Sequence, residues 1–176
     1  MEWKELKDEE IEVTLFKHFD RYQNVTKCWR KVEGGWVIKD IAFLEQWGEE
    51  DYKTLVSCLK NTVSTGGVVF GTFTDGCLKG FASVESGIFG SDKEYMDLSC
   101  IYVSTDQRGS GMGKLLFRLC ADWAREHGAK KLYISAHSAV ESQAFYKAMG
   151  CIEAVEYNKE HVEKEPCDCQ LEFVLS

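Results

Sequence analysis

A glycine-rich segment between a strand and an amphipathic helix constrains the fold of this chain most strongly. Residues 95–103 are predicted as a strand, and residues 112–127 carry apolar side chains at three- and four-residue intervals until Gly128 ends the helix. The segment between them reads Gln107-Arg108-Gly109-Ser110-Gly111-Met112-Gly113-Lys114. A strand that leads through glycines into a helix indicates an α/β domain.

The glycines of this segment favour the binding of an anion. Gly109, Gly111 and Gly113 lack the Cβ atoms that would keep a ligand from the backbone, and they lie at a helix start, where several N–H groups have no intrahelical partner. The helix dipole favours a pyrophosphate there by roughly 0.3–1 kcal/mol per charge, and Arg108 and Lys114 add cations. The spacing fits neither Gly-x-x-x-x-Gly-Lys-Ser/Thr nor the dinucleotide-binding Gly-x-Gly-x-x-Gly. A glycine-rich turn without a ligand is the alternative.

The sequence on both sides of this segment alternates between strand and helix patterns. Asp75-Gly76 supplies the positive backbone angles of a tight turn, which predicts a hairpin of residues 68–73 and 78–86. After the long helix, the predicted elements are a strand at 131–136, a helix at 141–149, and strands at 151–157 and 170–175. The order of elements predicts an α/β sandwich with a mixed sheet.

The first third of the chain has weaker patterns. Glu33-Gly34-Gly35 predicts a hairpin of residues 26–32 and 36–43, and residues 49–63 have the spacing of a helix. Residues 8–21 are expected to form a helix that turns four apolar side chains inward, namely Ile11, Leu15, Phe16 and Phe19.

Composition limits the class of protein. The chain has 176 residues, 44% of them hydrophobic, and a single proline, which predicts one continuous domain with a core of its own. The first 25 residues lack the pattern of a signal peptide, so we expect a cytoplasmic protein whose eight cysteines are reduced and mostly buried. One Cys167-x-Cys169 pair without a second pair is weak evidence for a metal, and we expect none. With 21 basic and 29 acidic residues, the chain lacks the basic footprint of a nucleic-acid binder, which favours a cationic partner.

Two linked motifs resemble the GNAT N-acetyltransferase superfamily. The first is Arg108-x-x-Gly111-x-Gly113 preceded by Ile101-Tyr102-Val103, and the second is Ser142-Gln143-Ala144-Phe145-Tyr146-Lys147-Ala148-Met149-Gly150-Cys151. The resemblance covers residues 68–157. It implies a GNAT-like mixed, mostly antiparallel β-sheet whose central parallel strands splay apart between flanking helices. It also implies one acetyltransferase domain over 1–176, with acceptor-side helices and hairpin in 1–66 and an acetyl-CoA-binding core in 67–176.

The resemblance assigns the acetyl-CoA-binding residues by position. Ile101 and Val103 would bond the pantetheine arm through main-chain groups, as an added strand would. The full set that the resemblance implies is Ile101, Tyr102, Val103, Arg108, Gly109, Ser110, Gly111, Met112, Gly113, Lys114, Ser142 and Tyr146. Two positions depart from the family pattern, because Thr105 stands where the family often has Pro and Ala139 where it often has Asn. Ser138 and Ser142 are the candidates to replace the lost asparagine hydrogen bond.

The same resemblance suggests catalytic roles. Tyr146 would protonate the departing coenzyme A thiolate, although packing within its helix is the alternative role. A lysine-like acceptor amine must lose a proton, which costs about 4.6 kcal/mol at pH 7. Asp97, six positions before Val103 and so expected on the same strand face, is the candidate base through a water relay; substrate recognition and a structural hydrogen bond are alternatives. Glu94 and His137 are second choices.

The transfer itself has two possible routes. Cys100 could accept the acetyl group first, but strand alternation places Cys100 and Asp97 on opposite faces, which favours a core role for Cys100. Direct attack by the amine in a ternary complex is therefore preferred.

The acceptor is expected to be a primary amine of a small cationic molecule. The first third of the chain would lie on the acceptor side, and its aromatic and acidic residues suit a cation: Tyr22, Trp29, Trp36, Trp47, Glu49, Glu50 and Asp51. The alternatives are an antibiotic of the aminoglycoside or streptothricin kind, the N-terminus or a lysine of a protein, and a non-catalytic acetyl-CoA sensor. We expect no nucleic-acid or membrane partner, and a homodimer stays open.

Overall fold

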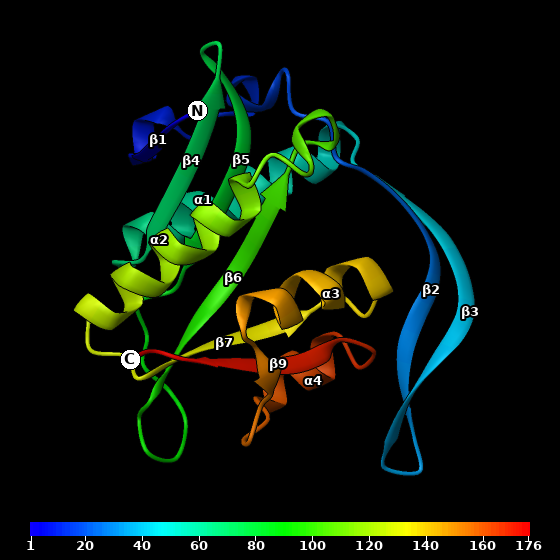
Figure 1. Ribbon diagram of the computed structural model, residues 1–176. Coiled ribbons are helices and arrows are strands. Elements are labelled where there is room, and N and C mark those ends of the chain that lie inside the picture. Colours follow the sequence, from blue (N-terminus) through cyan, green and yellow to red (C-terminus); the bar gives the residue numbers. More distant parts are fainter.

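The computed structural model describes residues 1–176 and contains one seven-stranded sheet and one separate two-stranded ribbon. The sheet order is β1-β4-β5-β6-β7-β9-β8, and β2 and β3 form the ribbon (Figure 1). The strands are β1 (Glu2–Glu5), β2 (Tyr22–Val32), β3 (Gly35–Gln46), β4 (Val68–Thr74), β5 (Cys77–Val84), β6 (Tyr95–Val103), β7 (Lys131–Ala136), β8 (Ile152–Glu153) and β9 (Cys169–Val174). The helices are α1 (Glu49–Ser64), α2 (Met112–Glu126), α3 (Val140–Met149) and α4 (Lys159–Lys164). The predicted fold class, a mixed and mostly antiparallel sheet flanked by helices, is confirmed.

Helices cover both faces of the sheet. α2 buries one stripe of side chains at four-residue spacing, Met112, Leu116, Cys120 and Ala124, against the sheet, as its periodicity predicted. α3 packs on the same face through Phe145, Tyr146 and Met149. On the other face α1 packs against a second cluster, in which Leu59 meets strand residues such as Phe81.

The central parallel pair of strands opens along its length. β6 and β7 pair only at Tyr95↔Lys131, Met96↔Leu132 and Asp97↔Tyr133. Beyond Asp97, β6 follows β5 while β7 follows β9, so the two strands diverge toward their carboxyl ends. The residues of β6 from Ser99 onward therefore have main-chain groups without a partner strand on the β7 side. The splayed parallel pair is the feature that positions the candidate site.

A β-bulge in β6 changes which residues share a face. Ser83 pairs with Cys100 but the next residue, Val84, pairs with Leu98, so Ser99 is the extra residue. Leu98 and Ile101 therefore both face α2, and the side chains of Asp97 and Cys100 both lie on the other face. The predictions that Asp97 shares a face with Val103 and that Cys100 opposes Asp97 are wrong, because strict alternation does not allow for an inserted residue.

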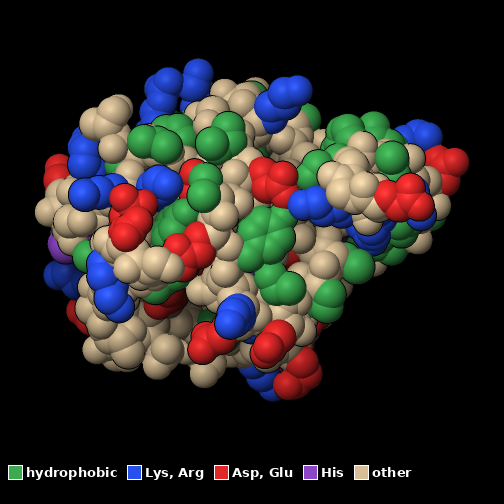
Figure 2. Space-filling model, turned by 90° about the horizontal axis from the view of Figure 1, so that it is seen from below, with side chains coloured by type: hydrophobic (Ala, Val, Ile, Leu, Met, Phe, Trp, Pro, Cys, Tyr) green, Lys and Arg blue, Asp and Glu red, His purple; other side chains and the backbone are tan.

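The ribbon of β2 and β3 stands out from the body of the protein. Figure 2 shows its outer end as a projecting lobe on which hydrophobic, basic and acidic side chains are interspersed. Its contact with the core lies at the end of β7: the Trp29 amide donates to the Ser138 carbonyl at 2.8 Å, and Arg30 Nη1 donates to Ser138 Oγ at 2.6 Å. At the tip side, Lys31 forms an ion pair with Glu153 at 2.9 Å. The hairpin predicted in this region is confirmed and is longer than expected.

Several expectations for local structure are corrected. The helix predicted over 8–21 is wrong, since the segment forms two 3₁₀ turns, Asp8–Glu10 and Val13–Phe16. Ile11, Phe16 and Phe19 are nevertheless buried as expected, so burial was predicted better than backbone geometry. The strand predicted over 151–157 is reduced to β8, and α4 follows it without having been predicted.

The structure also describes the state of the cysteines and the character of the helices. All eight cysteines are free thiols, and four of them, Cys28, Cys120, Cys151 and Cys169, are buried. None of the helices has the length and apolar character needed to cross a bilayer.

Candidate active site

A cavity of about 630 Å³, called the main cavity here because the predicted site residues line it, lies where β6 and β7 diverge. β6 contributes residues from Leu98 to Val103, and the segment after it contributes Gln107 to Lys114 apart from Ser110. α3 adds Tyr146 and Ser142, and β7 adds Ser135 with His137 just beyond it. The fold thus brings into one cavity nearly all the residues to which the two sequence motifs assigned acetyl-CoA.

The glycine-rich segment has the backbone that an anion site requires. Gly109 and Gly111 have φ angles of 81° and 87°, values that favour glycine, and a Cβ added at either would meet nothing within 4 Å. Gly111 is the N-cap of α2, so the first N–H groups of that helix face this open space. Gly113 has a different reason to be glycine, because its Cβ would lie 3.2 Å from the Phe145 ring.

Thr105 and Arg108 fix this segment to the start of the ribbon. The Thr105 amide donates to the Asp20 carbonyl at 2.9 Å, and Thr105 Oγ1 accepts from the Tyr22 amide at 3.3 Å. Arg108 Nη2 donates to the Tyr22 carbonyl at 2.6 Å, while partial burial lowers the pKa of its guanidinium. The threonine that replaces the family's proline thus joins the loop to the first third of the chain.

The two serines proposed to replace the missing asparagine have different surroundings. Ser138 is buried and accepts a hydrogen bond from Arg30, so its hydroxyl is engaged with the ribbon. Ser142 lies in the first turn of α3, lines the cavity and makes no side-chain hydrogen bond to the protein. Its hydroxyl is the one of the two that faces the cavity.

Tyr146 extends from α3 into the cavity between the diverging strands. Burial raises the pKa of its phenol far above the ordinary value, with the charge of Asp168 among the smaller causes, so the neutral, proton-donating form is favoured. Its hydroxyl makes no hydrogen bond to the protein. A buried, neutral phenol with a free hydroxyl can donate a proton to a group placed in the cavity.

The ribbon and its base supply the other end of the cavity. Arg21 is 5% exposed, pairs with Glu45 at 3.0 Å, and lies over the rings of Tyr102 and Trp47 at 4.9 and 5.5 Å. Gln23 and Asn24 of β2 complete this wall. Of the aromatic and acidic residues predicted to line the acceptor side, none lines this cavity; Trp29 and Trp36 border a separate apolar hollow beside α3.

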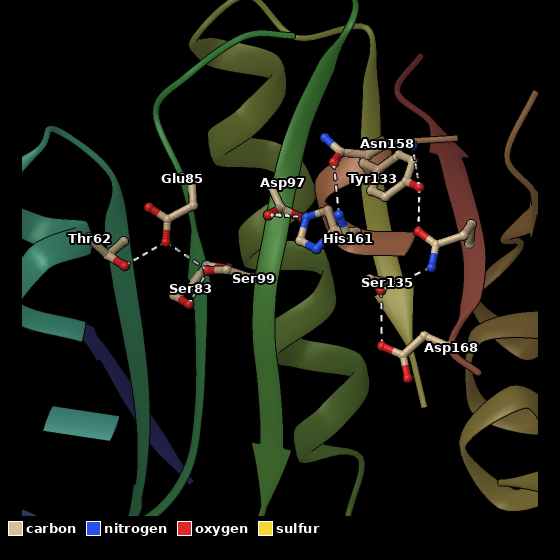
Figure 3. A network of polar contacts seen from close by, with 11 residues as sticks. Thr62, Ser83, Glu85, Asp97, Ser99, Tyr133, Ser135, Asn158, His161 and Asp168 are labelled. Atoms are coloured by element: carbon tan, nitrogen blue, oxygen red, sulfur yellow. Dashed lines mark hydrogen bonds and ion pairs between the residues drawn. The ribbon is translucent and has the colours of Figure 1, made fainter. Parts of the chain in front are cut away.

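Asp97 lies outside this cavity. Its Oδ2 is 2.8 Å from His161 Nε2 of α4, and its Oδ1 is buried without a hydrogen-bond partner. The hydrogen bond with Asp97 raises the pKa of the His161 imidazole. Both residues border a second hollow of about 740 Å³ on the face opposite α2. Figure 3 shows the pair between β6 and α4, with α2 behind the sheet.

The second-choice bases are placed differently from one another. Glu94 immediately precedes β6, at the end of that strand remote from the splayed end, and its Oε2 lies 3.5 Å from Lys131 Nζ. His137 lines the main cavity, and its Nδ1 accepts the Ala139 amide hydrogen at 3.0 Å. That bond leaves the proton of the neutral imidazole on Nε2, so His137 presents a donor rather than a base.

Cys100 also lines the main cavity, yet its thiol is a poor nucleophile. Burial raises its pKa to about 12, and its Sγ lies 3.0 Å from Ser83 Oγ. Almost none of a thiol with that pKa is ionised to the thiolate at neutral pH.

Sequence reasoning missed Asp168, which precedes β9. Its Oδ2 accepts a hydrogen bond from Ser135 Oγ at 2.9 Å, and Ser135 lines the main cavity. A prediction that the last strand pairs antiparallel with β7 would have indicated Asp168, because such a strand places its first residues beside the carboxyl end of β7.

The fold and the cavity together define a class of protein. A splayed parallel pair leads into a glycine-rich helix start, and a buried tyrosine from the next helix faces the gap between the strands. The chain belongs to the acetyltransferase (GNAT) family, whose model matches residues 22–151. It is therefore an acyltransferase of the N-acetyltransferase kind, as the two motifs indicated. No curated protein matches the chain.

Solved structures of low sequence identity share the fold over the whole chain. A putative streptothricin acetyltransferase from Bacillus anthracis in complex with acetyl coenzyme A superposes with a TM-score of 0.74 and 13% identity, covering 100% of both chains. A nourseothricin acetyltransferase gives 0.70 and 14%, covering 99% of this chain and 98% of that one. The PaiA N-acetyltransferase of Thermoplasma acidophilum in complex with coenzyme A gives 0.60 and 13%, covering 98% of each.

Proposed function

We propose that this protein transfers the acetyl group of acetyl-CoA to a primary amine of a small cationic molecule. The observation that carries the proposal is the single cavity that joins the glycine-rich start of α2 to the gap between β6 and β7. A pyrophosphate at the open space beside Gly111 and a pantetheine arm along Ile101 and Val103 place the thioester beside Tyr146. Two structural relatives are named as complexes with acetyl-CoA or coenzyme A, which supports this choice of donor.

The roles of the residues follow from this placement. The free main-chain groups of Ile101 and Val103 bond the pantetheine amides, as a neighbouring strand would. Lys114 contributes a cation to the diphosphate, and Ser142 offers a hydroxyl at the start of α3. Tyr146 gives its proton to the thiolate as the C–S bond breaks.

A small cationic acceptor is favoured by the charges on the far side of the gap. Glu45 and Asp168 bring carboxylates to the cavity wall or beside it, and the protein as a whole has a formal charge of −8. The shared fold with streptothricin and nourseothricin acetyltransferases supports a small molecule over a protein lysine or N-terminus. The free Tyr146 hydroxyl supports catalysis over a sensor that only binds acetyl-CoA.

Direct attack by the amine is favoured over an acetyl-cysteine intermediate. Cys100 of β6 lines the cavity, and its raised pKa of about 12 keeps it protonated. With both substrates varied, initial rates should give intersecting double-reciprocal lines, whereas parallel lines would indicate a covalent acetyl-enzyme, for which Cys100 is the candidate.

The experiment that tests the function is thiol release from acetyl-CoA with a panel of amines. The panel contains polyamines, amino acids, aminoglycoside and streptothricin antibiotics, and lysine-containing and amino-terminal peptides. We expect the highest kcat/KM with a small dicationic or polycationic amine. Selective turnover of peptides would move the function to protein acetylation, and binding of acetyl-CoA without turnover of any amine would indicate a sensor.

A further inference from the structure

The carboxylate of Asp168 is partly buried and has no ion-pair partner in the protein. One oxygen, Oδ2, accepts the hydrogen bond from Ser135 Oγ at 2.9 Å, and Oδ1 makes none. Figure 3 shows the second oxygen directed away from Ser135, toward the carboxyl ends of β6 and β7. A carboxylate withdrawn from water without a cation costs free energy, and a bound cation offsets that cost.

The strand register places this carboxylate beside the gap between β6 and β7, on the face of the sheet opposite α2. Cys169 pairs with Ala136, so Asp168 lies beside the end of β7, where that strand has already parted from β6. Ile134 and Ala136 of β7 pack toward α2, so Ser135 between them points to the opposite face. The carboxylate therefore lies across the sheet from Tyr146, which approaches from α3.

The titratable groups around Asp168 come from five parts of the fold. The pKa of the Asp168 carboxyl is affected by His161 of α4, His137 after β7 and Glu45 of β3. The charge of Asp168 in turn raises the pKa of Tyr146 of α3 and of Tyr102 of β6. Burial is the largest effect and raises the pKa of the Asp168 carboxyl. A raised pKa makes a carboxylate a better proton acceptor, because the ideal base titrates near the working pH.

We propose that Asp168 binds the ammonium group of the acceptor and removes its proton before attack. This assignment rests on the proposed acetyltransferase function and adds to it the residue that activates the acceptor. An N–H bond of the ammonium breaks and the proton passes to Asp168 Oδ1. The freed lone pair forms the C–N bond at the thioester carbonyl while the C–S bond breaks, and the thiolate takes the proton of Tyr146. The second proton of the nitrogen then restores the phenol, and Asp168 loses its proton to water.

The alternative base, Asp97, is less suited to this role. Its Oδ2 is occupied by His161 at 2.8 Å, its Oδ1 is buried, and it borders the other hollow. It also lies at the last paired position of β6, before the gap opens, whereas Asp168 lies beside the gap itself. The two aspartates are therefore a matched pair for mutation.

The test compares Asp168→Asn, Asp97→Asn and the control Asp92→Asn, an exposed loop residue, by thiol release at saturating acetyl-CoA from pH 6.5 to 10. The acceptor is the amine with the highest kcat/KM for the unaltered protein. We expect Asp168→Asn to lower kcat/KM by at least about 100-fold at pH 7 and much less at pH 10, where a typical amine is partly neutral. The acetyl-CoA-induced rise in melting temperature should persist, which shows that the variant is folded and binds its donor.

The outcomes separate this inference from the proposed function. Two results would overturn the assignment while the unaltered protein still turns over an amine, and both leave the acetyltransferase function standing. In the first, Asp168→Asn has an unchanged kcat/KM. In the second, the pH-dependent loss occurs in Asp97→Asn and not in Asp168→Asn. Absence of turnover with every amine overturns both. If Asp168→Asn does not fold, Ser135→Ala is the second variant; it removes the hydrogen bond to Asp168 and the one that Ser135 Oγ accepts from Gln170 Nε2 at 3.1 Å. It should raise the KM for the amine several-fold without changing that for acetyl-CoA, and an unchanged KM would count against the assignment.

Discussion

The chemistry of the candidate site depends on a few side chains whose surroundings are set by burial. Tyr146 is the clearest case, because a buried phenol with a raised pKa and a free hydroxyl is kept as a proton donor. Its place in the cavity follows from α3, whose neighbouring residues Phe145 and Met149 pack against the core and fix the helix. The second sequence motif predicted the residue, while its protonation state could be inferred only once its burial was known.

We expect Tyr146→Phe to lower kcat by roughly 10- to 1,000-fold while leaving the affinity for acetyl-CoA nearly unchanged, since the hydroxyl acts mainly as the thiolate departs. Steady-state kinetics with the preferred amine, together with acetyl-CoA titration by calorimetry, measures both quantities. Full activity in the variant would assign Tyr146 a packing role.

Gly111 gives a second test at this scale. Acetyl-CoA should raise the melting temperature of the protein, because a ligand that binds only the native state stabilises it by RT ln(1 + [L]/Kd). Gly111→Glu should abolish that rise by placing a negative charge in the open space where we propose that the diphosphate binds. Gly111→Ala is the matched control, since it imposes the same strain at a φ of 87° without the charge. A ligand-induced rise that survives in Gly111→Glu would contradict the placement of the diphosphate.

At the scale of elements, the short helix α4 shows what sequence patterns leave out. Its six residues are too few for a clear periodicity, and it is held by contacts distant in sequence. His161 bonds Asp97 of β6 and stacks on Tyr133 of β7 with ring centroids 5.6 Å apart (Figure 3). The bulge at Ser99 was missed for a related reason, since it depends on the partner strand. Both features determine which carboxylates face which cavity.

The Asp97–His161 pair predicts a pH dependence of stability. Asp97 raises the pKa of His161 in the folded state, so the pair stabilises the fold fully below the unfolded pKa of about 6.5, and this stabilisation is lost as the pH rises through the folded value. The melting temperature of the unaltered protein should therefore exceed that of His161→Gln by more at pH 5.5 than at pH 8.5. His18→Gln, at an exposed residue whose side chain makes no hydrogen bond, is the control. A difference independent of pH would mean that His161 acts only by packing.

For the whole molecule, the sequence predicted the elements from residue 68 to 149 better than those of the first third. From residue 68 onward, hydrophobic periodicity and turn glycines gave the order of β4 to α3 nearly residue by residue. In the first third, apolar residues such as Ile11 and Phe16 were expected inside correctly, but the backbone there is set by packing on the sheet rather than by local preference. The same holds for the site: motif residues were predicted, while Arg21, Glu45 and Asp168 reach it only through tertiary contacts.

The assignment of residues 1–66 to the acceptor side is therefore a proposal for the molecule as a whole. In the structure the base of the ribbon supplies Arg21, Gln23, Asn24 and Glu45 to the cavity, opposite the start of α2. We expect Glu45→Gln, which weakens the ion pair with Arg21, to raise the KM for the amine several-fold while leaving the KM for acetyl-CoA unchanged. Steady-state kinetics with each substrate varied in turn makes this comparison; a change confined to the acetyl-CoA KM would place these residues on the donor side.

The measurement that tests the central claim most directly is the identification of the product. The protein is incubated with isotopically labelled acetyl-CoA and the preferred cationic amine, and the products are separated and analysed by mass spectrometry. We predict an amine heavier by one labelled acetyl group, attached to nitrogen as an amide, in an amount equal to the free thiol released. Thiol release without an acetylated amine, or acetyl found on Cys100 or on an oxygen atom of the acceptor, would contradict direct transfer to a primary amine.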